Sequence, residues 1–129
     1  MIPNKQIFLS RYNNLNREQK EAVDTIYGPV MVIAGPGTGK TEILSMRIAN
    51  LLLSDAQVKA HEILCLTYTD EGSVAMRKRL LEIIGCDAHR VNIYTFHAFC
   101  NNIIQSNPQY FGMRYLKPID ELERTEILH

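Results

Sequence analysis

The sequence predicts an α/β fold, in which a parallel sheet is flanked by helices and followed by a short helical tail. Short apolar runs with many β-branched residues, at 30–33, 63–68 and 91–94, alternate with longer segments of helical spacing. Such alternation is typical of parallel sheets whose strands are joined by helices. A glycine-rich turn joins the first run to the next helix. The first two runs are expected to be buried strands, and a sheet this small is expected to be incomplete.

Start and stop signals place the helices along the chain. Residues 1–14 are expected to be irregular, because they contain several turn-forming residues. Asn16 is a good N-cap, with Gln19 at the capping-box position. Gly85 is expected to end the third helix, and Asn107-Pro108 the fourth. The predicted helices are 17–26, 40–53, 73–84, 96–104 and 120–128.

Composition limits the classes of function. The chain has 129 residues, of which 46% are hydrophobic and 22% are charged, as in one ordinary globular domain or part of one. Lys and Arg number 14, and so do Asp and Glu, so any nucleic-acid contact must depend on a local patch. Cys65, Cys86 and Cys100 lack metal-ligand spacing, which indicates reduced thiols in a cytoplasmic protein. No apolar run is long enough to predict a membrane span.

Residues 34–41 read AGPGTGKT, a close match to the phosphate-binding P-loop, or Walker A motif. A triphosphate needs converging N–H donors and close backbone approach, which the glycines of this loop permit. Lys40 would reach the β- and γ-phosphates as the catalytic cation, and the Thr41 hydroxyl would hold Mg²⁺. Ala34 stands where the strict pattern has glycine, and its methyl group is tolerable at a negative φ. The predicted phosphate-binding set is Ala34, Gly35, Pro36, Gly37, Thr38, Gly39, Lys40 and Thr41.

Four stretches, in this order, resemble the superfamily 1 DNA helicases of the UvrD/PcrA/Rep type. The first, 15–23 (LNREQKEAV), is similar to the family's Q motif, and the second is the P-loop, which commonly begins with alanine in this family. The third, 63–80 (ILCLTYTDEGSVAMRKRL), is similar to motif Ia, except that Asp70 and Glu71 replace the usual Asn-Lys. The fourth, 94–100 (YTFHAFC), resembles the TFHSF element.

The resemblance implies a RecA-like P-loop NTPase fold and an ATP hydrolase that moves along single-stranded DNA, with ATP and Mg²⁺ as cofactors. It makes Gln19 the residue that reads adenine, because a carboxamide can donate to N7 and accept from the N6 amino group. Alone, Gln19 also fits a capping box. Tyr68, Thr95, Phe96 and His97 would face the DNA, where an aromatic ring stacks on bases of any sequence. Alone, His97 also fits a core or capping histidine.

The resemblance also implies that this chain is the N-terminal part of a longer helicase. Residues 1–105 would be the nucleotide-binding part of the first motor domain, and 106–129 the start of a helical insertion. The family's DExx motif, which holds magnesium and orients the attacking water, would lie in the rest of the helicase chain. This part alone is therefore expected to bind nucleotide without turnover. DNA repair, plasmid replication and recombination all stay open as the pathway.

Two other interpretations remain open at this point. The chain would be a small, self-contained P-loop enzyme, such as a kinase, if Asp70-Glu71 after the apolar run at 63–68 served as a Walker B pair. The helicase interpretation also explains Met76-Arg77 and the TFH element, which a kinase leaves unexplained. Alternatively, the chain is a partial domain that binds nothing well because its sheet is incomplete.

Overall fold

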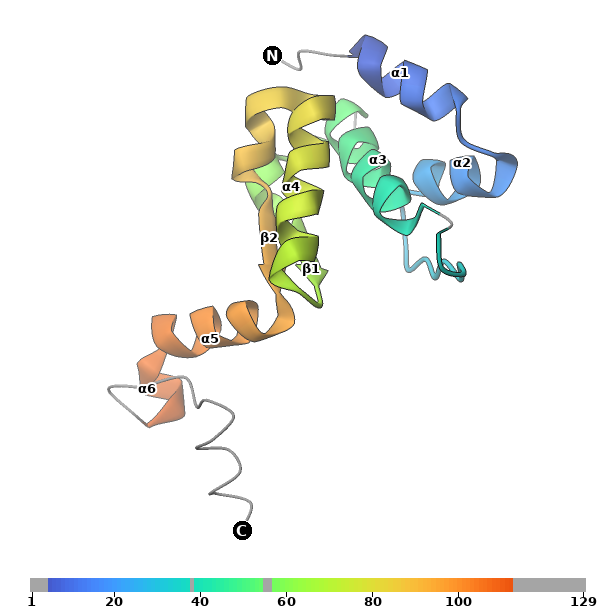
Figure 1. Cartoon of the computed structure of the whole chain (residues 1–129). Helices are drawn as coiled ribbons and strands as arrows, with labels where there is room; N and C mark the ends of the chain where they lie inside the picture. Colours follow the sequence, from blue (N-terminus) through green and yellow to red (C-terminus); the bar gives the residue numbers. More distant parts are fainter. Residues whose placement is uncertain (1–4, 38, 55–56, 113–129) are drawn as a thin grey trace.

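The structure is a computed structural model that describes residues 5–37, 39–54 and 57–112. In chain order the elements, with the two 3₁₀ helices labelled η, are α1 (Lys5–Asn13), α2 (Arg17–Asp24), α3 (Lys40–Leu53), η1 (Ala60–Glu62), β1 (Leu64–Thr67), α4 (Asp70–Ile84), η2 (Gly85–Arg90), β2 (Asn92–Thr95), α5 (Phe96–Ser106) and α6 (Pro108–Phe111). A small two-stranded sheet lies beside α4, with α3 and then α1 and α2 further from it, and the last two helices extend away from the others (Figure 1).

The two strands are parallel neighbours. β1 and β2 pair in a register that runs from Leu64↔Asn92 to Thr67↔Thr95, and α4 with η2 connects them. Because the strands are parallel, their carboxyl ends meet at the same edge of the sheet. The predicted α/β fold with parallel pairing is therefore confirmed for the second and third apolar runs.

The prediction of a buried strand at 30–33 is wrong. These residues form no strand, and Met31 and Ile33 are 86% and 91% exposed. A strand requires a neighbour that shares its backbone hydrogen bonds. Within the described ranges, β1 and β2 pair only with each other. The apolar run therefore has the composition of a central strand but no strand to pair with among the described residues. The sheet that the structure describes has two strands instead of the expected three.

The prediction that residues 1–14 are irregular is also wrong, because α1 occupies Lys5–Asn13. The contacts that stabilise this helix are tertiary. Phe8 is buried in the core, and Tyr12 Oη donates to Asp24 Oδ2 over 2.6 Å. Phe8 and Tyr12, one turn apart, stack with their ring centroids 5.8 Å apart.

The capping box predicted for α2 is confirmed. Gln19 N donates to Asn16 Oδ1, and Asn16 N donates to Gln19 Oε1, each over 2.9 Å. α2 ends at Asp24, two residues before the predicted end, and α3 occupies the predicted range Lys40–Leu53. Local signals therefore determine where these two helices begin.

α4 is longer than predicted, because it begins at Asp70 instead of residue 73. The Thr69 hydroxyl accepts a hydrogen bond from Gly72 N and caps the helix there. Gly85, with φ of 67°, ends α4 as predicted. Val74, in the first half of α4, is exposed.

α5 leaves the sheet directly after β2 and ends before Asn107-Pro108, as the sequence predicts. In this fully described helix no side chain is buried. The predicted helix at 120–128 lies outside the described residues. In the part of the chain that the structure describes, no helix has the length and apolar character needed to cross a membrane.

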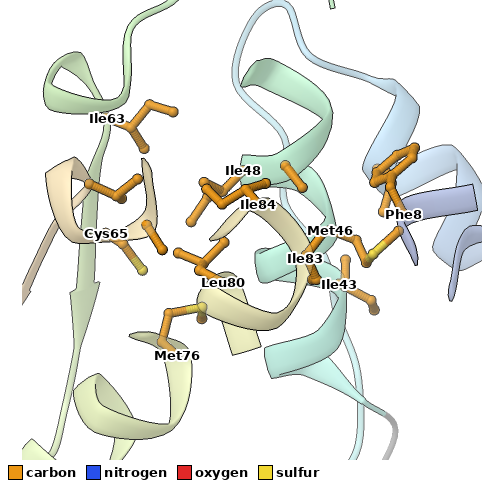
Figure 2. Close-up of a cluster of buried hydrophobic side chains, with 14 of the residues drawn as sticks. Phe8, Ile43, Met46, Ile48, Ile63, Cys65, Met76, Leu80, Ile83 and Ile84 are labelled. Carbon is orange, nitrogen blue, oxygen red and sulfur yellow. The ribbon is translucent and has the colours of Figure 1, made fainter. Parts of the chain in front are cut away.

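The hydrophobic core lies mainly between α3 and α4 (Figure 2). Phe8 joins it from α1, while Ile63 and Cys65 join it at the end nearest β1 (Figure 2). The largest fully buried side chains include Met46, Met76, Leu80, Ile83, Ile84, Val23 and Val91. Ile43, near the start of α3, belongs to this core, so the core fixes the helix that follows the glycine-rich loop.

Candidate functional site

The glycine-rich loop runs directly into the N-terminus of α3. Gly37 and Gly39 have φ values of 72° and 77°, in the left-handed region that favours glycine. Gly39 is the N-cap residue of α3 and, as a glycine, brings no side chain to cap the helix. Gly35 and Pro36 are exposed, and Thr38 lies outside the described residues. The first-turn N–H groups of α3 and the positive end of its dipole therefore point toward the glycine-rich loop, the arrangement that favours an anion.

Lys40 is the first residue of α3, and its side chain reaches back to the loop. Its Nζ donates to the carbonyl oxygen of Ala34 over 3.4 Å, which is long for a hydrogen bond. Thr41, the predicted magnesium ligand, is half-buried in the same turn. The Lys40 ammonium is thus held at the loop by a contact much weaker than an ion pair with a phosphate.

Gln19 lies close to the start of α3. A Cβ added to Gly39 would lie 3.7 Å from Gln19 Nε2. The other end of the carboxamide, Oε1, accepts the Asn16 N–H in the capping box. Gln19 therefore caps α2 and also approaches the loop, and its reading of adenine stays a prediction.

A hollow of about 270 Å³ lies beside Lys40, between residues 30–33 and α3. Its lining is mostly apolar and includes two cationic side chains; the lining residues are Val30, Val32, Lys40, Ile43, Leu44 and Arg47. Arg47 Nη1 donates to the carbonyl oxygen of Ala22 over 2.8 Å, which ties α3 to α2. Of the predicted phosphate-binding residues, only Lys40 lines this hollow, which therefore lies next to the loop and along α3.

An exposed aromatic pair lies at the carboxyl edge of the sheet. Tyr68 follows β1 and Phe96 follows β2, with ring centroids 5.3 Å apart and ring planes tilted by 43°. Tyr68 is 89% exposed, and Phe96 and His97 are also exposed. Exposed rings at this spacing present faces on which nucleic-acid bases can stack.

Thr95 has a structural role at the same edge. It is buried, and its hydroxyl accepts a hydrogen bond from Ala98 N over 3.1 Å, which caps α5. This cap orients the first turn of α5, where Phe96 and His97 lie. The predicted contact between Thr95 and DNA stays a prediction.

The acidic pair Asp70-Glu71 lies in the first turn of α4, where negative charge stabilises a helix. Among the residues that the structure describes, no group of three His, Cys, Asp or Glu side chains could hold a metal ion. A magnesium ion that keeps several waters and binds phosphate oxygens needs few protein ligands, which fits a single hydroxyl such as that of Thr41.

The sequence did not point to four charged side chains that meet beside the loop. Arg11, Glu42, Arg79 and Glu82 come from α1, α3 and α4 and form ion pairs. No local pattern pairs them, because their helices are far apart in the sequence. The available signal was Glu42, a carboxylate in the first turn of a helix expected to bind a triphosphate.

The fold and the loop together define an α/β protein with a glycine-rich turn before a helix and an exposed aromatic pair at one edge of its sheet. The family model "UvrD/REP helicase N-terminal domain" matches residues 15–129, so this chain belongs to that family. The resemblance based on four motifs is therefore confirmed.

Individual relatives agree with the family match. The ATP-dependent DNA helicase PcrA of Staphylococcus aureus strain Mu50 is 33% identical over 117 residues, which cover 90% of this chain and 16% of the relative. The protein of the same name from Staphylococcus epidermidis is 34% identical over 116 residues, covering 89% of this chain and 16% of the relative. The chain thus spans 16% of the length of these curated relatives.

Proposed function

We propose that this chain binds ATP with Mg²⁺ as the nucleotide-binding part of a helicase that moves along single-stranded DNA. The observation that carries the proposal is the glycine-rich loop at the N-terminus of α3, with the Lys40 side chain reaching back to Ala34. The relatives named ATP-dependent DNA helicase PcrA support it. In this proposal residues 1–105 belong to the first motor domain, with its P-loop NTPase fold, and 106–129 begin a helical insertion.

The chemistry of each residue suggests its part. Backbone N–H groups of 35–39 would hold the phosphates, and Lys40 would exchange its weak contact with Ala34 for the β- and γ-phosphates. Thr41 would hold magnesium, which neutralises part of the phosphate charge when it is bound. Gln19 would recognise adenine from its position beside the loop.

The carboxyl edge of the sheet is the proposed path of single-stranded DNA. Tyr68 and Phe96 would stack on bases, and His97 would contact the strand from the first turn of α5. Thr95 would contribute mainly by capping that turn. Because stacking depends little on base identity, the proposal predicts binding with weak sequence preference.

Titration with a fluorescent ATP analogue in the presence of Mg²⁺ tests the nucleotide site. We expect saturable binding, and we expect Lys40→Ala to weaken it by about tenfold or more, because a charged contact to the phosphates is lost. Lys59→Ala, which removes an exposed ammonium on a different segment, is the matched control and is expected to bind normally. Binding that Lys40→Ala leaves unchanged would overturn the proposal.

A steady-state assay of phosphate release, with and without single-stranded DNA, separates nucleotide binding from turnover. We expect no turnover from this chain alone, since hydrolysis needs acidic residues that hold magnesium and orient water. Turnover that Asp70→Asn abolishes would instead support the self-contained enzyme with Asp70-Glu71 as its Walker B pair.

A further inference from the structure

A cluster of charged side chains lies beside the phosphate-binding loop. Arg11 Nη1 on α1 lies 3.2 Å from Glu42 Oε1 and 3.3 Å from Glu42 Oε2, and Arg11 Nη2 pairs with Glu82. Arg79 Nη1 on α4 lies 2.5 Å from Glu42 Oε2. We call Arg11, Glu42, Arg79 and Glu82 the arginine–glutamate cluster. Burial lowers the pKa of Arg11, but its bonds to Glu82 and Glu42 outweigh that effect and raise the pKa above its ordinary value.

Glu42 brings this cluster to the nucleotide site. It follows Thr41 in the first turn of α3, and its Cβ would lie 3.9 Å from a Cβ added to Gly39. The Glu42 side chain is 22% exposed, so solvent screens its charge only in part. A carboxylate in this turn repels a bound triphosphate unless nearby cations neutralise it. Both oxygens of Glu42 are within ion-pair distance of arginine.

We propose that Arg11 and Arg79 are positioning residues of the nucleotide site, which neutralise Glu42 and so set the preference of the loop for triphosphates over diphosphates. This inference rests on the proposed function, because it assumes that the loop binds a nucleotide. α1 precedes residues 15–129, the range of the family match, so Arg11 acts on the domain from a helix outside that range. Arg79 supplies the second charge from α4, which packs against α3 in the core.

The test compares fluorescent ATP and ADP analogues on the same variants. Arg79→Gln leaves Glu42 with one arginine, so it should weaken ATP binding by about fivefold and ADP binding by about twofold. Glu42→Gln combined with Arg79→Gln removes the repelling charge and should restore ATP binding to within about twofold of the unsubstituted chain. The loss in Arg79→Gln should shrink at high salt, because screening weakens the repulsion.

Two further variants separate charge from structure. Arg90→Gln removes one positive charge from a side chain that is 74% exposed in η2, and it should leave both nucleotides unaffected. Arg79→Lys keeps the charge and should keep the preference for ATP. If Arg79→Gln does not fold by circular dichroism, Arg11→Gln and its combination with Glu42→Gln provide the same comparison.

Several results would overturn the inference. One is a ratio of ATP to ADP affinity that Arg79→Gln leaves unchanged. Another is an ATP affinity of the Glu42→Gln, Arg79→Gln double variant as low as that of Arg79→Gln alone, which is the result that a purely structural role of Arg79 predicts. If Lys40→Ala weakens nucleotide binding by about tenfold or more in the same assay, these results count against the role of the cluster and leave the proposed nucleotide site standing. If the unsubstituted chain shows no saturable binding, the proposed nucleotide site fails, and the inference fails with it.

Discussion

Tyr68 and Phe96 lie with their ring centroids 5.3 Å apart because each follows a residue of one pair in the parallel sheet, Thr67 and Thr95. The parallel register thus joins two sequence motifs into one exposed surface. Tyr68 lies directly before Thr69, the N-cap residue of α4, and Phe96 is the first residue of α5, directly after its N-cap Thr95. In both helices the N-cap side chain accepts a backbone hydrogen bond, which fixes the local backbone. An aromatic surface held in this way is pre-organised, which reduces the conformational entropy lost when a ligand binds.

Removing either ring should weaken binding of single-stranded DNA. Stacking of one base on an aromatic side chain contributes about 1–3 kcal/mol, so Tyr68→Ala or Phe96→Ala should each raise the dissociation constant by about tenfold. Fluorescence anisotropy with a labelled oligothymidine measures this change. Tyr27→Ala removes another exposed tyrosine, between α2 and the glycine-rich loop, and should have no effect. Equal affinities for all three variants would contradict the proposed DNA path.

The acidic pair Asp70-Glu71 should limit DNA affinity, because it lies two and three residues after the exposed ring of Tyr68. Asp70→Asn with Glu71→Lys should strengthen binding to single-stranded DNA by about fivefold at low salt, with a smaller gain at high salt. The same variant should lower the stability of α4 by about 0.3–1 kcal/mol per residue, since negative charge is lost at the helix N-terminus.

A matched charge change elsewhere tests whether the location of Asp70-Glu71 matters. Glu18→Gln with Glu21→Lys makes the same change in net charge on α2, which lies on the far side of α3 from the sheet (Figure 1). We expect this control to change DNA affinity by less than about twofold. If both double variants gain the same affinity for single-stranded DNA, the effect comes from net charge and not from the position of Asp70-Glu71 at the carboxyl edge of the sheet.

The sequence predicted those parts of the fold that local chemistry determines. The capping box of Asn16 and Gln19 begins α2, and Gly85 ends α4, because each acts through backbone groups a few residues away. The phosphate site stays a prediction, but it rests on the same kind of local signal, since a P-loop is a short continuous stretch with a fixed spacing. Two β-strands, β1 and β2, could also be predicted, because each finds its partner within the described residues.

The features that sequence reasoning missed depend on contacts between distant residues. α1 is stabilised by burial of Phe8 and by contacts of Arg11 and Tyr12 with other helices, and its own sequence carries no strong helix signal. Conversely, residues 30–33 have the composition of a strand, but composition does not supply a pairing partner. Burial of Thr95 was missed because its role as a cap depends on where α5 begins.

Arg77 should be the most important charged residue for the stability of the sheet. Its Nη1 donates to the carbonyl oxygens of Ala88 and Val91 over 2.6 and 2.8 Å, which ties α4 to the start of β2. Arg77→Ala should lower the free energy of unfolding by about 2 kcal/mol, because partly buried carbonyl groups lose a charged donor. Arg90→Ala, which loses only an exposed pair with Asp87 at 3.9 Å, should cost less than about 0.5 kcal/mol. Urea denaturation followed by circular dichroism compares the two, and equal losses would contradict this role.

The three cysteines should differ sharply in reactivity. Burial raises the pKa of the Cys65 thiol, and the positive charge of Arg77 offsets this only in part. Cys86 and Cys100 are exposed. Because the thiolate is the reactive form, a disulfide reagent at about pH 8 should modify Cys86 and Cys100 quickly, and Cys65 only when the chain unfolds. Mass spectrometry of partly modified protein identifies the sites, and early labelling of Cys65 would show that the core opens beside β1.

The exposed run at 30–33 should make this chain self-associate. Met31 and Ile33 present large apolar side chains to solvent on a segment rich in strand-forming residues, a combination that favours pairing between chains. Met31→Thr with Ile33→Thr keeps the β-propensity but removes apolar surface, so it should reduce self-association. Sedimentation velocity at increasing protein concentration measures the effect.

Val74→Thr is the matched control for this prediction. Val74 is also exposed and apolar, but it lies in α4, whose backbone groups are already paired within the helix. If unpaired backbone at 30–33 drives association, Val74→Thr should leave the sedimentation profile unchanged. A similar reduction in both variants would mean that exposed apolar area alone drives association, and a chain that is monomeric at all concentrations would contradict the prediction directly.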